Sequence, residues 1–202
     1  MTSLYCIVLL QLTTTFALGQ LVPQSKPSRV PGEPAAVVRS LYQVVVARHP
    51  IGLPGGADRK GITPYLSKDL VHRLDTALAC QNDYLRQHQN PNEKPQMDWF
   101  ELGLFSGGNE RALPGGFHVE SVQPEKDGFF RVHVRLKYSE PDRMPYWYVD
   151  VILTKENGHF VVDDVVFPKD DWDDESRLSQ TLTSGCEGSR WVGYGERQSD
   201  SK

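Results

Sequence analysis

The chain has 202 residues, of which 39% are hydrophobic, and a formal net charge of -4. This length fits one domain with extensions, and the apolar content is enough to build a core. The slightly acidic balance leaves no overall basic surface, which argues against nucleic acid as the main partner.

The first 19 residues have the pattern of a secretory signal. Residues 4–12 are mostly apolar, no charged side chain occurs before Lys26, and Ala17-Leu18-Gly19 fits the small-residue rule for signal peptidase. We therefore expect a secreted or periplasmic protein without stable membrane insertion after cleavage. An uncleaved membrane anchor is the alternative, although the apolar run is short against the roughly 20 residues that span a bilayer.

The rest of the chain divides by composition. Residues 20–33 contain three prolines and predict a flexible leader. We expect one folded domain over residues 34–194 and a disordered tail over residues 195–202.

Removal of the signal also removes Cys6 and leaves two cysteines, Cys80 and Cys186. In an oxidising compartment, two remaining cysteines in one small domain predict a disulfide. Closing such a loop stabilises a fold by up to ~4.7 kcal/mol on the chain-entropy model. Two separate buried thiols are the alternative. The six histidines form no zinc-ligand spacing with the cysteines, so we expect neither a metal nor another cofactor.

Two helices are predicted in the N-terminal half. Pro34 suits a first helical position, and apolar residues follow at helical spacing over residues 35–48. Residues 51–61 contain Pro54-Gly55-Gly56 and predict a loop. Ser67 is a good N-cap for a long helix over residues 68–88.

The region from residue 97 to residue 167 predicts strands. We expect strands at residues 97–104 and 117–122, with a glycine-rich loop between them, and then three antiparallel strands at residues 130–138, 146–155 and 159–167. In the first of these three, apolar and polar residues alternate strictly, so one face is buried and the other is solvated. Asn157-Gly158 predicts a type I′ hairpin turn.

The C-terminal region carries an acidic cluster at residues 170–175. A calcium loop is one interpretation, but the EF-hand spacing is absent. The pattern favours a helix N-terminus with Asp171 as cap and Asp174 in the third position, running to about residue 183 and ended by Gly185. The disulfide would then attach this helix to the long one.

Three stretches carry a resemblance to a known family: residues 34–42, residues 65–70 and the ending Phe160-Val161-Val162-Asp163-Asp164-Val165. With two helices before a run of strands, the chain resembles the nuclear transport factor 2-like superfamily and, more narrowly, the bacterial domain-of-unknown-function family 3828. The resemblance implies an α+β fold in which a curved antiparallel sheet wraps around N-terminal helices, a cone-shaped, cystatin-like roll. That family brings no catalytic residues to this chain.

A cone-shaped fold predicts a pocket on the concave face of the sheet. Five aromatic residues are candidates to line it, although they could equally fill the core: Tyr42, Tyr84, Trp99, Tyr138 and Trp147. The preferred function is a non-enzymatic domain that binds a small molecule or a protein there. One alternative is an isomerase or dehydratase with Asp164 as its acid–base carboxylate, since Asp164 is in register with Phe160 and Val162 and is expected to point inward if they do. A capping or salt-bridged residue at the end of the strand is the other interpretation of Asp164. A secreted inhibitor or immunity-type partner protein is a third possibility, and a homodimer stays open.

Overall fold

The fold is α+β, as the sequence predicts, with a five-stranded antiparallel sheet and helices packed against it. The structure is a computed structural model that describes residues 33–90, 95–107, 113–139, 146–169 and 174–194. The predicted signal, nearly all of the leader, the tail and the predicted cap Asp171 lie outside the described residues.

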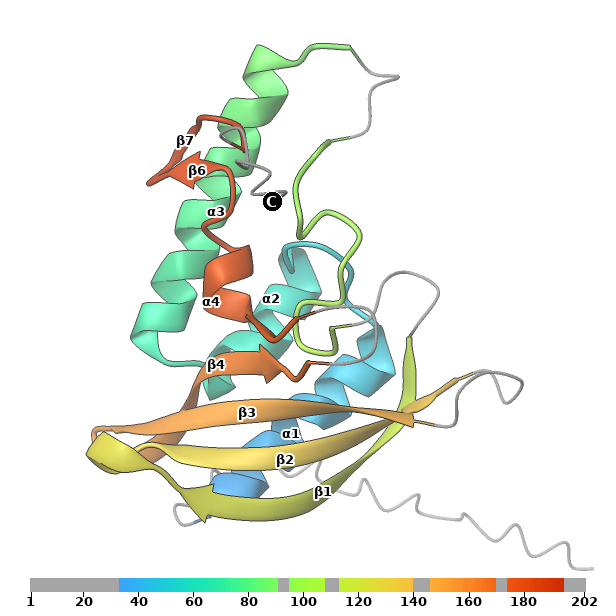
Figure 1. The fold of residues 1–202 in the computed structure, drawn as a ribbon, viewed down its shortest axis with the longest axis vertical. Coiled ribbons are helices and arrows are strands. Elements are labelled where there is room, and N and C mark those ends of the chain that lie inside the picture. Colours follow the sequence, from blue (N-terminus) through green and yellow to red (C-terminus); the bar gives the residue numbers. More distant parts are fainter. Residues whose placement is uncertain (1–32, 91–94, 108–112, 140–145, 170–173, 195–202) are drawn as a thin grey trace, which may run out of the picture.

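The sheet has the strand order β1-β2-β3-β4-β5 and forms the lower part of the molecule in Figure 1. Its strands are β1 (Pro114–Pro124), β2 (Phe130–Tyr138), β3 (Tyr146–Glu156), β4 (His159–Phe167) and the short β5 (Ser176–Arg177). The turn between β3 and β4 is confirmed, because Asn157 and Gly158 have positive φ angles of 50° and 79°.

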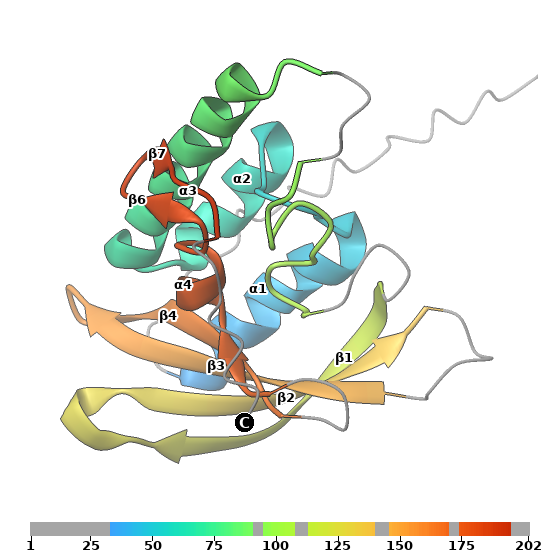
Figure 2. The same ribbon diagram turned by 45° about the horizontal axis from the view of Figure 1, so that its top comes forward.

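The alternation along β2 and β3 gives the sheet an inner and an outer face. The centre of the inner face is fully buried, with side chains from Val132, Val134, Leu136, Val149, Val151 and Leu153. Helix α1 (Pro34–Arg48) begins with the predicted proline and lies across this inner face (Figures 1 and 2). Its buried stripe of Val38, Leu41, Tyr42 and Val45 completes the layer.

Helix α3 (Lys68–Gln87) extends away from the sheet beyond the β4 edge (Figure 1). Its predicted cap is confirmed, since the Ser67 hydroxyl accepts a hydrogen bond from the Leu70 N–H at 3.0 Å. A parallel bridge between Leu66 and Val162 attaches the start of α3 to β4. α3 packs against β4 and also against the C-terminal segment.

Strand β4 departs from the predicted alternation because it contains a β-bulge. Residues 152 and 153 of β3 are neighbours, but their partners on β4 are Asp164 and Val162, so Asp163 is an extra residue. Val162 and Val165 consequently both face the core. The prediction that Asp164 points inward together with Val162 is therefore wrong.

Two other segments differ from the sequence predictions. Residues 97–104 form turns, not a strand, with backbone hydrogen bonds from Phe100 to Met97 and from Leu102 to Trp99. The expected loop at residues 51–61 contains a short helix, α2 (Gly56–Ile62), with a 3₁₀ turn η1 (Thr63–Tyr65) directly after it.

The C-terminal helix is much shorter than predicted. α4 (Leu178–Thr181) has four residues, and Asp174 lies outside it. The residues just before α4 pair instead with the open edge of β4 as β5, which satisfies their backbone groups within the sheet. A small hairpin of β6 (Cys186–Glu187) and β7 (Arg190–Trp191) follows and packs on α3 (Figure 2).

Candidate functional site

Two of the aromatic residues predicted to line a pocket lie fully inside the core. Tyr42 and Trp99 have no exposed surface. The Tyr42 hydroxyl donates to the Phe105 carbonyl at 2.6 Å, and Trp99 Nε1 donates to Gln81 Oε1 at 3.0 Å. Burial, with the Asp150 carboxylate adding to it, raises the pKa of Tyr42 above its usual range. Both rings therefore fill the concavity.

The other three candidates also make packing contacts. Trp147 Nε1 donates to the Ser106 carbonyl at 2.6 Å, and its ring packs against Tyr138 with centroids 4.4 Å apart. Tyr84 is 3% exposed and meets the Trp191 ring edge-on at 5.1 Å. The structure thus gives all five aromatic residues neighbours within the protein.

Asp164 closes the first turn of α4. It is 7% exposed, and its carboxylate accepts from the Ser179 N–H at 3.0 Å and from the Ser179 hydroxyl at 2.7 Å. Arg177 lies 3.7 Å away. The carboxylate thus ties β4 to the C-terminal segment, and its position on the outer face removes it from the concavity.

The neighbouring Asp163 has a raised pKa. Burial raises its pKa, with Asp69 and Asp164 contributing, while the Ser67 hydroxyl opposes the shift. Asp163 is the extra residue of the β-bulge. Simple alternation along β4 does not predict a bulge and therefore points to Asp164, two residues after Val162.

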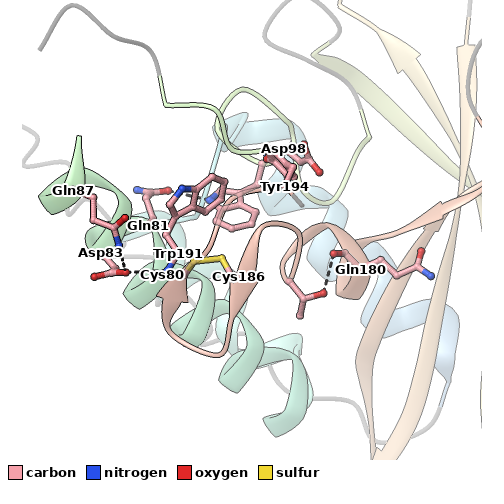
Figure 3. The surroundings of a disulfide bond; sticks show 11 residues. Cys80, Gln81, Asp83, Gln87, Asp98, Gln180, Cys186, Trp191 and Tyr194 are labelled. Atoms are coloured by element: carbon pink, nitrogen blue, oxygen red, sulfur yellow. Dashed lines mark hydrogen bonds between the residues drawn. A yellow bond between two sulfur atoms is a disulfide. The ribbon is translucent and has the colours of Figure 1, made fainter. Parts of the chain in front are cut away.

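The predicted disulfide is confirmed and anchors a C-terminal clamp, which we define as residues 186–194 (Figure 3). Cys80 on α3 is bonded to Cys186, with 6.2 Å between their Cα atoms. The Trp191 N–H donates to Asp83 Oδ2 at 2.9 Å. This hydrogen bond, with Arg86 adding to it, lowers the pKa of Asp83.

A polar depression lies on the outer face of the sheet, across β1, β2 and β3. This outer-face depression has a volume of about 280 Å³ and is lined by Ser121, Gln123, Arg131, His133 and Asp150. Ser121 faces His133 across β1 and β2, and His133 faces Asp150 across β2 and β3. Because side chains of facing residues start only about 5 Å apart, the sheet itself brings these groups together.

Ion pairs hold the charged side chains of the depression in place. Asp150 accepts from Arg131 Nη1 at 2.8 Å and from His133 Nδ1 at 2.6 Å. Arg131 Nε also donates to Glu125 at 2.5 Å. Burial disfavours the charged guanidinium, but its hydrogen bonds to Asp150 and Glu125 outweigh burial and raise the pKa of Arg131. Arg131 is therefore a fixed cation between two carboxylates.

Two exposed tyrosines on β3 continue from His133 along the outer face, and we call them the tyrosine surface. Tyr148, 38% exposed, stacks on the His133 ring with centroids 4.8 Å apart. Tyr146, 45% exposed, meets Tyr148 edge-on at 5.7 Å and carries the Arg135 guanidinium 5.4 Å from its ring. The surface therefore presents ordered aromatic rings to solvent.

The same row contains the residue types of a hydrolytic triad, Ser121, His133 and Asp150. A nucleophile must lie within hydrogen-bond reach of its base, yet within the described residues no hydrogen bond joins Ser121 to His133. Asp150 also shares its charge with Arg131. In this part of the chain, no group of three or more His, Cys, Asp or Glu is placed to hold a metal ion.

Sequence reasoning missed the outer-face depression. The alternation of Arg131 and His133 with buried valines marks them as outward-facing, but their neighbours depend on strand register. The β2–β3 connection is long and contains two prolines, so no short turn defines that register.

No protein-family model, curated protein or solved structure matches this chain. No helix in the described ranges is long and apolar enough to cross a membrane.

Proposed function

We propose that the protein is an exported, non-enzymatic domain that binds a small polar ligand in the outer-face depression. The proposal rests on one observation: polar side chains surround the depression, and some of their donor and acceptor atoms face it. Asp150 can only accept, so His133 donates through Nδ1 and leaves Nε2 as a free acceptor in the neutral ring. Ser121 and Gln123 supply a hydroxyl and an amide on the adjacent strand.

Rigidity supports a binding role. The lining residues stand on the paired strands β1, β2 and β3, and Arg131 and His133 are further held by Asp150. Groups that are already ordered lose little conformational entropy when a ligand binds. The depression therefore needs few adjustments to accept a ligand.

Export is supported by the disulfide between Cys80 and Cys186, since such bonds persist in oxidising compartments. The predicted signal peptide agrees with this location. Membership of the nuclear transport factor 2-like superfamily is part of the same proposal, supported by the order of two long helices followed by an antiparallel sheet.

An acid–base enzyme has less support, because Asp164 is engaged by Ser179 on the outer face. An inhibitor or immunity-type protein would use the tyrosine surface as its contact area, with Tyr146 and Tyr148 as anchors. A small ligand is favoured over a protein because the polar groups converge on one depression.

A fragment screen by thermal shift and ¹⁵N–¹H correlation spectroscopy tests this proposal. A ligand present at about 100 times its Kd stabilises the fold by about 2.7 kcal/mol. We expect ligands to shift amide signals of β1–β3, and expect Gln123→Ala and His133→Ala to abolish the stabilisation. Gln43→Ala, on the exposed side of α1, is the matched control and should behave as the wild type. A ligand that shifts amide signals of the concave face would contradict the proposal. So would a ligand that still binds both variants.

A further inference from the structure

We propose that the tyrosine surface, with the basic side chains beside it, is a docking site for an acidic segment of a partner protein. The site is separate from the outer-face depression and does not depend on ligand binding there. Five side chains form it, and we call them the docking patch: His118, Arg135, Lys137, Tyr146 and Tyr148.

The strand registers place the docking patch in two neighbouring rows of the outer face. Arg135 faces His118 on β1 and Tyr148 on β3. Lys137, two residues further along β2, faces Tyr146. The residues that alternate with them along these strands pack in the core, so the side chains of the patch are directed outward. The sheet therefore groups two tyrosines with the basic side chains of β2.

The two tyrosines are exposed and yet held in place by their neighbours. Tyr148 stacks with one face on His133, and the Arg135 guanidinium lies over the Tyr146 ring. The two tyrosine rings also meet edge-on. Side chains that are already ordered lose little conformational entropy on binding. Exposed tyrosine and arginine are also the residue types that carry much of the binding energy in protein interfaces.

The charge of the docking patch differs from that of the whole chain. Arg135 pairs with Glu120 at 2.7 Å, whereas within the described residues no ion pair engages the exposed Lys137. The surplus charge here is therefore positive, although the chain as a whole has a net charge of -4. An acidic partner is attracted at this patch and repelled by the rest of the chain. The charges thus select the partner and the orientation in which it docks.

An acidic protein segment fits the docking patch better than an anionic membrane or a second copy of the chain. Electrostatic attachment to a membrane uses clusters of about 4–8 basic side chains, whereas this patch supplies Arg135 and Lys137. A twofold interface uses the same surface on both subunits. Two copies joined through the patch would therefore bring these cations of one subunit toward those of the other.

The spacing of the docking patch defines the sequence of the partner segment. Lys137 and Tyr146 face each other across two strands, so their side chains start about 5 Å apart. Neighbouring residues of an extended segment are about 3.3 Å apart along the chain. A carboxylate on Lys137 and an apolar side chain on Tyr146 can thus come from residues one or two positions apart. The expected segment carries Asp or Glu within two residues of an apolar or aromatic residue.

Selection of random dodecapeptides displayed on phage, with the whole protein as the target, tests the proposal. We expect enriched peptides to contain the acidic–apolar pattern. Synthetic copies of them should shift amide signals of residues 116–118, 135–137 and 146–148 in ¹⁵N–¹H correlation spectra. Binding should weaken as NaCl rises from about 0.1 M to about 1 M, because the Debye length falls from ~10 Å to ~3 Å.

Two variants test the two halves of the docking patch. Tyr146→Ala removes an aromatic anchor, and Lys137→Glu reverses the unpaired charge; each should weaken binding of the selected peptides at least about tenfold. Lys126→Glu is the matched control, because it makes the same charge reversal at an exposed position in the β1–β2 turn and should bind as the wild type does. Circular dichroism verifies that all three variants fold.

Several results would overturn the docking proposal while leaving ligand binding in the depression unaffected. One is a selection that enriches no peptide, or one that enriches basic or uncharged peptides. Another is peptides that bind Lys137→Glu as well as Lys126→Glu, or that shift signals elsewhere. Binding to vesicles of phosphatidylcholine and phosphatidylserine, or a dimer in light scattering, would also overturn it if Tyr146→Ala abolishes that association.

Discussion

His133 and Asp150 face each other across β2 and β3, and His133 Nδ1 lies 2.6 Å from Asp150 Oδ1. The second carboxylate oxygen of Asp150 accepts from Arg131 at 2.8 Å. Asp150 is thus the shared acceptor that sets the orientation of both basic side chains in the outer-face depression.

Replacing Asp150 should therefore destabilise the fold more than replacing an exposed carboxylate. Asp150 is 14% exposed, and Asp150→Ala removes the carboxylate partner of His133 and leaves Arg131 with Glu125 alone. The variant should lower the free energy of unfolding by about 1–3 kcal/mol. Asp75→Ala is the control, because Asp75 pairs with Arg59 but is 62% exposed; its cost should stay below about 1 kcal/mol. Urea denaturation measures both. Equal costs would show that Asp150 has no special structural role.

Removal of the disulfide should release the C-terminal clamp. The bond joins cysteines 106 residues apart, so the double variant Cys80→Ala/Cys186→Ala should lose about 3–5 kcal/mol of unfolding free energy. The sheet keeps its own core, so we expect amide protection to fall in residues 186–194 before it falls in β2 and β3. Hydrogen exchange and urea denaturation check the two effects. Uniform loss of protection over the whole chain would contradict a separate clamp.

The hydrogen bond from the Trp191 N–H to Asp83 predicts a pH-dependent stability. The folded-state pKa of Asp83 lies below its ordinary value of 3.8, so the ionised carboxylate stabilises the fold above that value. The contribution is lost as the pH falls through the lower folded-state pKa. Asp83→Asn should thus have a lower Tm than the wild type at neutral pH, and the difference should narrow progressively below pH 3.8. A Tm difference that is constant with pH would refute this role.

The regular elements with strong local signals were predictable from the sequence. Pro34 and Ser67 mark helix starts through their own backbone and side-chain chemistry, and Asn157-Gly158 closes a hairpin for the same kind of reason. The disulfide followed from the number of cysteines left after the predicted cleavage. For the helix starts and the hairpin turn, the information lies within a few residues of the feature.

Features that depend on partners far along the chain were not predictable. The bulge at Asp163 reverses the side chains after it, and only the pairing of β3 with β4 reveals it. α4 is short because the edge of β4 was free to pair with Ser176–Arg177. The outer-face depression likewise requires the registers of β1, β2 and β3 together. A shift of one residue in register exchanges the two faces of a strand, so simple alternation from Val162 predicts the wrong face for Asp164.

The packing of Trp191 within the clamp can be tested with two matched glycines. Gly185 and Gly188 both have positive φ angles, 73° and 59°, so alanine at either position carries a similar backbone penalty of about 1–2 kcal/mol. A Cβ at Gly185 would lie 2.6 Å from Trp191 Cη2, whereas one at Gly188 would meet nothing within 4 Å. Gly185→Ala should therefore cost about 1–3 kcal/mol more than Gly188→Ala, because the indole must move away from Tyr84. Urea denaturation gives the two costs, and tryptophan fluorescence should shift only in Gly185→Ala. Equal costs and unchanged fluorescence would mean that the indole has room to move without loss of packing.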